Sequence, residues 1–277
     1  MDSGFNRMIY RIKPHVPERI WNAMTSPYWW WYNRARHQFA AAFDRRLANS
    51  KASLSSYRDL HQGERCFIIG NGPSLNKMDL SLIRDEYTFG MNRIYLLFPA
   101  LGFQTSYYLS VNSLVIEQIA DDIRALQMPR FITWRARQWF SRQDDILFID
   151  TDYTRPATFS QDITGRIFEG STVTYIALQL AYYMGFTEVI LIGVDHNFAT
   201  KGLPNVTMLS EGDDPNHFSA EYFGKGFRWQ LPDLEASERA YKLAEAAYGA
   251  SGRTILDATV GGKLKVFPKV KYGSLFG

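Results

Sequence analysis

RCFIIGNGPSL, residues 65–75, is the segment from which the fold of this chain can be predicted. Its first half is a short apolar run that ends in glycine, which is typical of a buried parallel strand. In its second half, Gly70 and Gly72 permit positive φ and a close backbone approach, and Pro73 suits the first turn of a helix. A strand, a glycine turn and a helix start predict backbone amides that bind a phosphate or a carboxylate. The same sequence is also compatible with a tight turn that binds no ligand.

On both sides of this segment, predicted strands alternate with predicted helices along the chain. Short apolar runs predict strands, and longer amphipathic or apolar stretches between them predict helices. This alternation favours an α/β protein with a Rossmann-like, mostly parallel sheet and helices on both faces, in which ligands bind beyond the carboxyl ends of the strands. The further strands are predicted at 87–91, 107–111, 131–134, 146–149, 189–194 and 254–256, and the helices at 114–126, 172–184 and 232–250.

Residues 1–60 differ in composition from the rest of the chain. We predict a helical extension at residues 1–60 and a Rossmann-like, nucleotide-binding catalytic domain at residues 61–277. Aromatic residues such as Trp21 and Trp29 alternate with arginines such as Arg34 and Arg45. A helix of this composition either docks on the catalytic domain or on a second subunit, or lies at a membrane interface near an acceptor lipid.

Composition excludes several classes of protein. A formal net charge of +3 is too small for the dense basic face of a nucleic-acid-binding protein. The single cysteine, Cys66, excludes an internal disulfide and a multi-cysteine zinc site. The sequence has no apolar run of membrane-spanning length and no hydrophobic signal core. We therefore expect a cytoplasmic protein, a monomer or a homo-oligomer, that either stays in solution or contacts the inner face of the membrane through residues 1–60.

Polar residues follow several of the predicted strands. Asn92 and Arg93 end the second strand, and Asn112 ends the third. Asparagine also serves as an ordinary cap or turn residue, so each has a ligand-binding and a structural interpretation. The segment Gly170-Ser171-Thr172 precedes an apolar helix, where it caps the helix, holds a ligand, or does both.

The second half of the chain contains the candidates for chemistry. Asp195 and His196 follow a strand, where active-site groups of α/β proteins usually lie. His217 is the favoured general base, because a histidine near neutral pH accepts a proton from a hydroxyl. It belongs to a long segment, residues 199–231, that we interpret as a functional lid. Tyr222, Lys225 and Arg228 in this segment can clamp a phosphate or stack on a ring.

The basic C-terminal stretch, from Gly261 through Lys269 and Lys271, has two interpretations. It forms a solvated tail, or it helps an anionic lipid or a substrate phosphate to bind.

These motifs together resemble two related groups of proteins. GNGPSL after a strand, FGMNR at the next strand end, MGFTEVILIGVD and PNHF are similar to the sialyltransferases that use CMP-sialic acid and to their relatives among flagellin glycosyltransferases. The same residues resemble the 6-hydroxymethylpterin diphosphokinase MptE-like group. The resemblance covers about residues 63–260.

The sialyltransferase resemblance implies roles for individual residues. Asn71 and Asn92 would contact the CMP moiety, and Gly70, Gly72 and Ser74 would shape its phosphate pocket. Such enzymes use a histidine base without a metal and invert the anomeric carbon, while two tyrosines hold the leaving phosphate. The sequence departs from this pattern, because His217 precedes the usual position of the base, and His196 and Phe198 stand where the tyrosines are expected. The leaving group would then depend on Tyr222, Lys225 or Arg228.

Two enzymatic hypotheses follow from these resemblances. In the first, the chain transfers a nonulosonic, sialic-acid-like sugar from a CMP donor to a glycan or lipid-linked acceptor and requires no cofactor. In the second, it is a diphosphokinase that binds ATP and Mg²⁺ near Asp195, Asp213 and Asp214 and stacks a pterin on an aromatic side chain. We favour the first, because a soluble pterin enzyme gains nothing obvious from residues 1–60. A non-catalytic nucleotide-binding protein is a third alternative.

Overall fold

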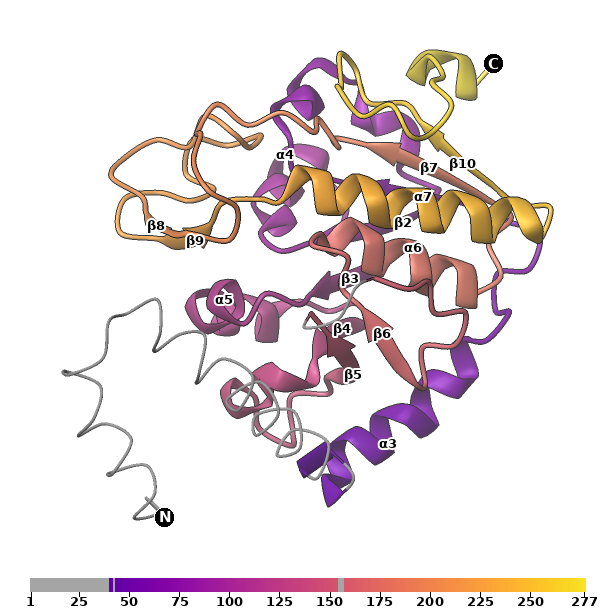
Figure 1. Ribbon diagram of the computed structural model, residues 1–277, viewed down its shortest axis with the longest axis vertical. Helices are drawn as coiled ribbons and strands as arrows, with labels where there is room; N and C mark the ends of the chain where they lie inside the picture. Colours follow the sequence, from indigo (N-terminus) through magenta and orange to yellow (C-terminus); the bar gives the residue numbers. More distant parts are fainter. Residues whose placement is uncertain (1–39, 42, 154–156) are drawn as a thin grey trace, which may run out of the picture. The chain divides into compact units, whose positions relative to one another are not determined.

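The computed structural model describes residues 40–41, 43–153 and 157–277 (Figure 1). The chain forms two compact units, residues 1–48 and 49–277. Most of the predicted N-terminal extension, including all of its tryptophans, lies outside the described residues. The helix α3 (Arg45–Leu54) ends in Leu54, which is fully buried in the core of the second unit. The two compact units divide between residues 48 and 49, and the domain boundary predicted at residue 60 stays a prediction.

Within the described residues, eight strands form one sheet in the order β10-β7-β1-β2-β3-β4-β5-β6, and all neighbouring strands are parallel. This confirms the predicted α/β, Rossmann-like fold. The seven predicted strands are present, whereas β6 was not predicted. The strands are β1 (Arg65–Ile69), β2 (Tyr87–Met91), β3 (Tyr107–Ser110), β4 (Arg130–Thr133), β5 (Leu147–Asp152), β6 (Arg166–Phe168), β7 (Glu188–Ile192) and β10 (Thr254–Asp257).

The order of the strands reverses at β1. From β1 to β6 the chain adds each strand on one side, and β7 then returns to the other side of β1. Ile69 of β1 lies level with Ile192 of β7, so the two strands end at the same edge of the sheet. Such a reversal is where doubly wound sheets place their ligands, because the connections leave the sheet in opposite directions.

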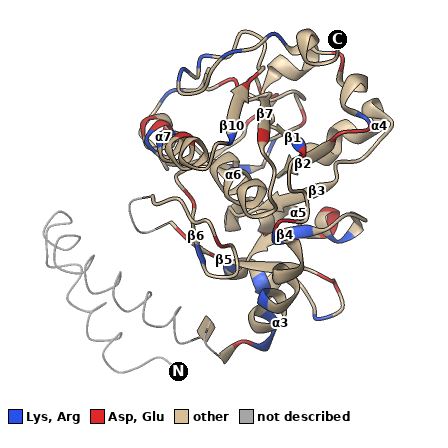
Figure 2. Cartoon of the chain, turned by 90° about the vertical axis from the view of Figure 1, so that its right-hand side faces the viewer, with Lys and Arg blue, Asp and Glu red and all other residues tan. Residues whose placement is uncertain are grey.

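Helices cover both faces of the sheet. Figure 2 shows α6 (Val173–Tyr183) and α7 (Leu234–Ala250) on one side, and α4 (Phe98–Leu101) and α5 (Ser113–Ala125) on the other. From Thr174 onward every residue of α6 is buried, as its almost wholly apolar sequence requires. No helix among the described residues is long and apolar enough to cross a lipid bilayer. The short 3₁₀ helices are η2 (Ser55–Tyr57), η3 (Pro73–Lys77), η4 (Leu80–Ile83), η5 (Ile94–Leu97), η6 (Trp134–Trp139) and η7 (Tyr272–Leu275).

The predicted lid, residues 199–231, has regular structure of its own. The strands β8 (Thr207–Leu209) and β9 (Arg228–Gln230) pair as an antiparallel hairpin. Phe223 stacks on Phe227 and Trp229, with ring centroids 4.8 Å and 5.6 Å apart. The segment is therefore an ordered substructure with an aromatic cluster.

The C-terminal stretch is packed on the domain, which contradicts its interpretation as a solvated tail. Leu264, Phe267 and Tyr272 are buried. The Lys269 ammonium lies 2.5 Å from a carboxylate oxygen of Asp257, a residue that is fully buried at the end of β10. This ion pair gives one of the C-terminal lysines a structural role.

Candidate functional site

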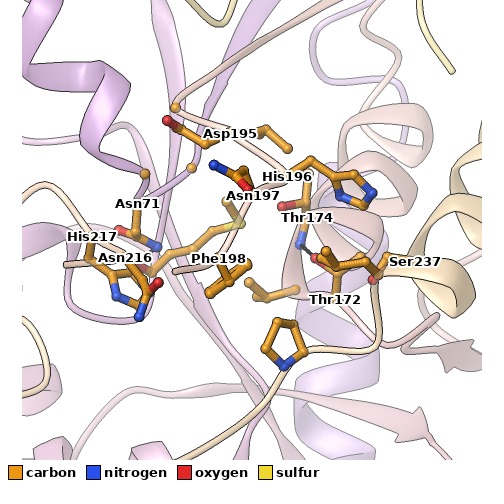
Figure 3. A pocket seen from close by; sticks show the side chains of 18 of the residues that line it. Asn71, Thr172, Thr174, Asp195, His196, Asn197, Phe198, Asn216, His217 and Ser237 are labelled. Carbon is orange, nitrogen blue, oxygen red and sulfur yellow. Dashed lines mark hydrogen bonds between the residues drawn. The ribbon is translucent and has the colours of Figure 1, made fainter. Parts of the chain in front are cut away.

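A pocket opens at the reversal of strand order, beyond the carboxyl ends of β1, β2 and β7 (Figure 3). Its walls also include the start of α6, the start of α7 and the segment around His217. The structure thus brings together side chains that are far apart in the sequence. The predicted site residues that line this pocket are Gly70, Asn71, Gly72, Asn92, Ser171, Thr172, Asp195, His196, His217 and Tyr222.

The Gly70–Leu75 turn is built on backbone contacts with the residues after β7. A Cβ atom on Gly70 would lie 2.2 Å from the Gly193 carbonyl oxygen, so only glycine allows this approach. The Gly72 amide donates a hydrogen bond to the same oxygen at 2.9 Å. The turn leads into η3, a 3₁₀ helix of five residues, instead of a longer helix with free amides at its start.

The carboxylate of Asp195 lies in this turn. One of its oxygens accepts a hydrogen bond from the Ser74 amide at 3.2 Å, and the other accepts from the Ser74 hydroxyl at 2.6 Å. A Cβ atom on Gly72 would lie 1.8 Å from the second oxygen. The sequence predicts an anion on these groups, and in the structure the anion is a side chain of the protein.

Two asparagines that follow neighbouring strands, Asn71 and Asn92, line the pocket. The Asn71 Nδ2 donates to the Met91 carbonyl at 3.2 Å, whereas its Oδ1 is buried and has no hydrogen-bond partner. Asn92 adopts a left-handed backbone conformation with φ 52°, which asparagine tolerates better than most residues. Its Oδ1 accepts from the Ser110 hydroxyl at 2.9 Å. An unpaired buried acceptor is costly, so Asn71 is prepared to accept a hydrogen bond from a ligand.

His217 pairs with a buried carboxylate. Its Nδ1 lies 2.7 Å from Oδ2 of Asp214, whose side chain is 4% exposed. The other oxygen of Asp214 accepts from the Asn216 amide at 2.8 Å. The imidazole also stacks on Tyr222, with centroids 3.9 Å apart and planes at 7°. These contacts fix the ring, and because a carboxylate accepts, they place the proton on Nδ1 and leave Nε2 as the basic nitrogen.

Two hydrogen bonds hold the His217 segment against the glycine turn and the 3₁₀ helix after it. The Phe218 amide donates to the Asn71 carbonyl at 2.9 Å. The Asn76 side chain, on η3, donates to the Phe218 carbonyl at 2.8 Å. His217 and Asn71 are thereby held on the same side of the pocket (Figure 3).

His196 lies across the pocket from His217 (Figure 3). Its Nε2 is 3.0 Å from a carboxylate oxygen of Glu238 on α7. Its backbone has φ 51°, and its ring meets the Tyr241 ring edge to face. Hydroxyl groups of Thr172, at the start of α6, and Tyr241 surround this side of the pocket.

Several predicted site residues do not line the pocket. Arg93 donates to the carbonyls of Glu221 and Tyr222 and so holds the segment that carries them. Arg228 forms an ion pair with Glu117 at 3.3 Å, and Lys225 is exposed. The remaining predicted residues outside the lining are Pro73, Ser74, Asn112, which caps α5, and Gly170, where a Cβ would lie 2.5 Å from the Tyr175 ring.

Several residues that line the pocket were not predicted as site residues. Thr174 and Tyr241 lie within helices and reach the pocket only because α6 and α7 begin there. Polar or aromatic examples elsewhere in the lining are Asn197, Phe198, Asn216 and Ser237.

The carboxylates considered for magnesium are held separately. Asp195 contacts Ser74 and Asp214 contacts His217, while Asp213 is exposed outside the pocket lining. Over the described ranges, no group of three or more His, Cys, Asp or Glu side chains is placed to hold a metal ion.

The parallel sheet and a pocket at its reversal define a Rossmann-like α/β protein. The chain belongs to the 6-hydroxymethylpterin diphosphokinase MptE-like family, whose family model matches residues 44–201. The match confirms the resemblance proposed from GNGPSL and the GVD strand end, and it stops before His217. No curated protein matches the chain.

Two solved structures are similar to this chain at low identity. The MAf glycosyltransferase from Magnetospirillum magneticum AMB-1 is 16% identical, with a TM-score of 0.48 over 82% of this chain and 39% of that one. The sialyltransferase CstII from Campylobacter jejuni, solved with the substrate analogue cytidine-5'-monophosphate, is 15% identical, with a TM-score of 0.42 over 76% of this chain and 85% of that one. The chain thus spans well under half the length of the first protein.

Proposed function

We propose that this protein is a glycosyltransferase that moves a nonulosonic sugar from a CMP-activated donor to a hydroxyl group of a glycan or lipid-linked acceptor. The observation that carries the proposal is the pair formed by His217, on the wall of a pocket at the reversal of strand order, and the buried Asp214. Such a pocket suits a nucleotide, and a carboxylate-oriented histidine suits the removal of a proton from a hydroxyl.

In this mechanism His217 acts as the general base. Its Nε2 takes the proton of the acceptor hydroxyl as that oxygen attacks the anomeric carbon of the donor sugar. The bond between this carbon and the phosphate oxygen breaks, and its electron pair leaves with CMP. Asp214 stabilises the imidazolium that forms, and Tyr222 keeps the ring in position through its stacked face.

The other residues of the pocket would bind the donor. The unpaired Oδ1 of Asn71 is an acceptor for an N–H or O–H group of the nucleoside, and Asn92 adds an amide on the same side. Among the described residues that line the pocket there is no lysine or arginine. His196, held by Glu238, is therefore the candidate for contact with the leaving phosphate in place of Lys225 or Arg228.

The diphosphokinase hypothesis makes a different demand on the same residues. It needs ATP with magnesium near Asp195, Asp213 and Asp214. The first and third of these already contact Ser74 and His217, so a metal ion would have to displace these bonds. Dependence on magnesium therefore separates the two hypotheses.

A thermal-shift screen with CMP, CTP, UDP, GDP and ATP, each with and without magnesium, tests the choice. We expect stabilisation by CMP without metal, because a ligand that binds only the folded state raises the melting temperature. Stabilisation by ATP with magnesium alone would favour the diphosphokinase.

Calorimetry with CMP then tests the site. Asn71→Ala should weaken CMP binding by about tenfold, which is the usual effect of losing one hydrogen bond in a pocket. Asn49→Ala, a change of the same type at an exposed position of α3, should leave the affinity unchanged. Equal affinities for wild type and Asn71→Ala would refute the assignment of the nucleotide site.

A further inference from the structure

The glycine turn after β1 already contains an anion. Both oxygens of the Asp195 carboxylate accept hydrogen bonds from Ser74, one from the amide and one from the hydroxyl. Ser74 is itself 3% exposed, and Asp195 is partly buried at the wall of the pocket. The turn therefore has the chemistry of an anion-binding loop, and the protein supplies the anion.

The residues around this carboxylate leave space for it and hold it in place. Any side chain on Gly72 would overlap Asp195, because a Cβ there would lie 1.8 Å from its Oδ2. The backbone of Asp195 is fixed as well, since its carbonyl accepts from the Lys263 amide at 2.8 Å. Gly72 is thus required for the approach of Asp195 and not only for the approach of a ligand.

Asn71 lies between the two anchored glycines of the turn. The Gly70 and Gly72 amides donate to carbonyls at the end of β7, at 2.7 Å and 2.9 Å. Beyond Gly72, the bonds of Ser74 to Asp195 hold the other end of the turn. Asn71, whose Oδ1 is buried and unpaired, consequently has a fixed position at the wall of the pocket. A negative charge at Asp195 also repels a phosphate from the same amides.

We infer that Asp195 is a positioning residue: its carboxylate is the internal anion of the turn, fixes Asn71, and makes this part of the pocket contact the nucleoside instead of the phosphate. The inference about the nucleoside rests on the proposed function. Asp195 does not touch the reacting atoms in this scheme and is no acid or base.

The first test needs no substrate. In the ¹⁵N-labelled full chain, the side-chain amide signal of Asn71 is assigned by its loss in Asn71→Ala. Asp195→Ala should shift or broaden this signal, and sodium formate, which supplies a carboxylate small enough for the vacated turn, should restore it. Sodium chloride at the same ionic strength should not. If Asp195→Ala leaves the Asn71 signal unchanged, or if formate has no more effect than chloride, the positioning role is wrong.

The second test measures what the turn contacts. Calorimetry should show that Asp195→Ala weakens the binding of cytidine by about tenfold and that of CMP by no more than this, because the substitution also removes the repulsion of the phosphate, and that formate restores cytidine binding. A loss confined to CMP would mean that the turn binds the phosphate, and it would overturn the inference. If wild type binds neither probe, the proposed function fails, while the signal of Asn71 still decides the positioning role.

A milder variant guards against loss of folding in Asp195→Ala. Ser74→Ala removes only the hydroxyl that donates to the carboxylate and keeps the amide contact. It should shift the Asn71 signal in the same direction and weaken cytidine binding, with no response to formate because the carboxylate is still present. An unshifted Asn71 signal in folded Ser74→Ala would contradict the inference.

Discussion

The substitution Asp214→Asn changes the protonation of the His217 ring while it preserves the packing around that ring. The amide has the size of the carboxylate, and its oxygen can still accept from the Asn216 amide, now at 2.8 Å from Oδ1. The NH₂ group then faces His217 Nδ1, which lies 2.7 Å from the present Oδ2. Because Nδ1 must accept this hydrogen bond, the imidazole proton moves to Nε2. That nitrogen can no longer remove a proton from an acceptor.

The expected loss in kcat is about 10²- to 10⁴-fold, the range for a positioned general base or for a wrong histidine tautomer. It corresponds to about 3–5.5 kcal/mol of transition-state stabilisation. Affinity for CMP should not change, since Asp214 lies behind His217 and outside the pocket lining. The assay is transfer from CMP-sialic acid, with calorimetry for CMP. Asp213→Asn, at the exposed neighbouring position, is the control. A kcat for Asp214→Asn equal to that of the control would refute the role of His217 as the base.

Two further predictions concern stability. Lys269→Met leaves the fully buried Asp257 with one less partner, and because the lysine is 42% exposed we expect a loss of about 2–3 kcal/mol in the free energy of unfolding, less than for a wholly buried pair. Urea denaturation measures it against Lys271→Met, and equal midpoints would contradict the structural role of the pair. Burial raises the pKa of Tyr108, Tyr222 and Tyr248 above the ordinary value. Above about pH 10 these tyrosines ionise in the unfolded chain before they do in the folded one, so the free energy of unfolding should hold below that pH and fall above it, by at most about 1.4 kcal/mol per pH unit for each tyrosine. An unchanged urea midpoint between about pH 9 and 11 would show that they are accessible in the folded protein.

Strands that are buried on both faces of the sheet could be predicted, because such burial requires a nearly continuous run of apolar residues. RCFII and EVILI, the sequences of β1 and β7, are buried almost throughout. The strand β6 could not be predicted this way. It has three residues, and it pairs with the end of β5, where Asp150 accepts from the Arg166 guanidinium. Contacts between distant segments, not local pattern, determine such strands.

The residues of the candidate site also fall into two groups: those whose position the fold predicts and those whose position depends on contacts between distant segments. Asn71, Asn92 and Asp195 follow strands of one parallel sheet, so the fold alone predicts that they meet at one edge. The role of Asp195 could not be predicted, because it depends on the approach of its carboxylate to Ser74 across two loops. The charge of Arg228 suggests a contact with a phosphate. In the structure, β9 places this residue beside Glu117 on α5.

The position of His217 depends on contacts that no sequence pattern encodes. The amide of its neighbour Phe218 donates to the Asn71 carbonyl, and the Phe218 carbonyl accepts from the Asn76 side chain, so the backbone next to the proposed base is held against the glycine turn. A lid that brought His217 to the donor on closing would have to break both bonds. We therefore expect His217 to be in place before the donor binds, together with the segment between β8 and β9 to which it belongs. The general base would then act on whichever hydroxyl reaches Nε2, and selection of the acceptor would be left to the residues at the mouth of the pocket.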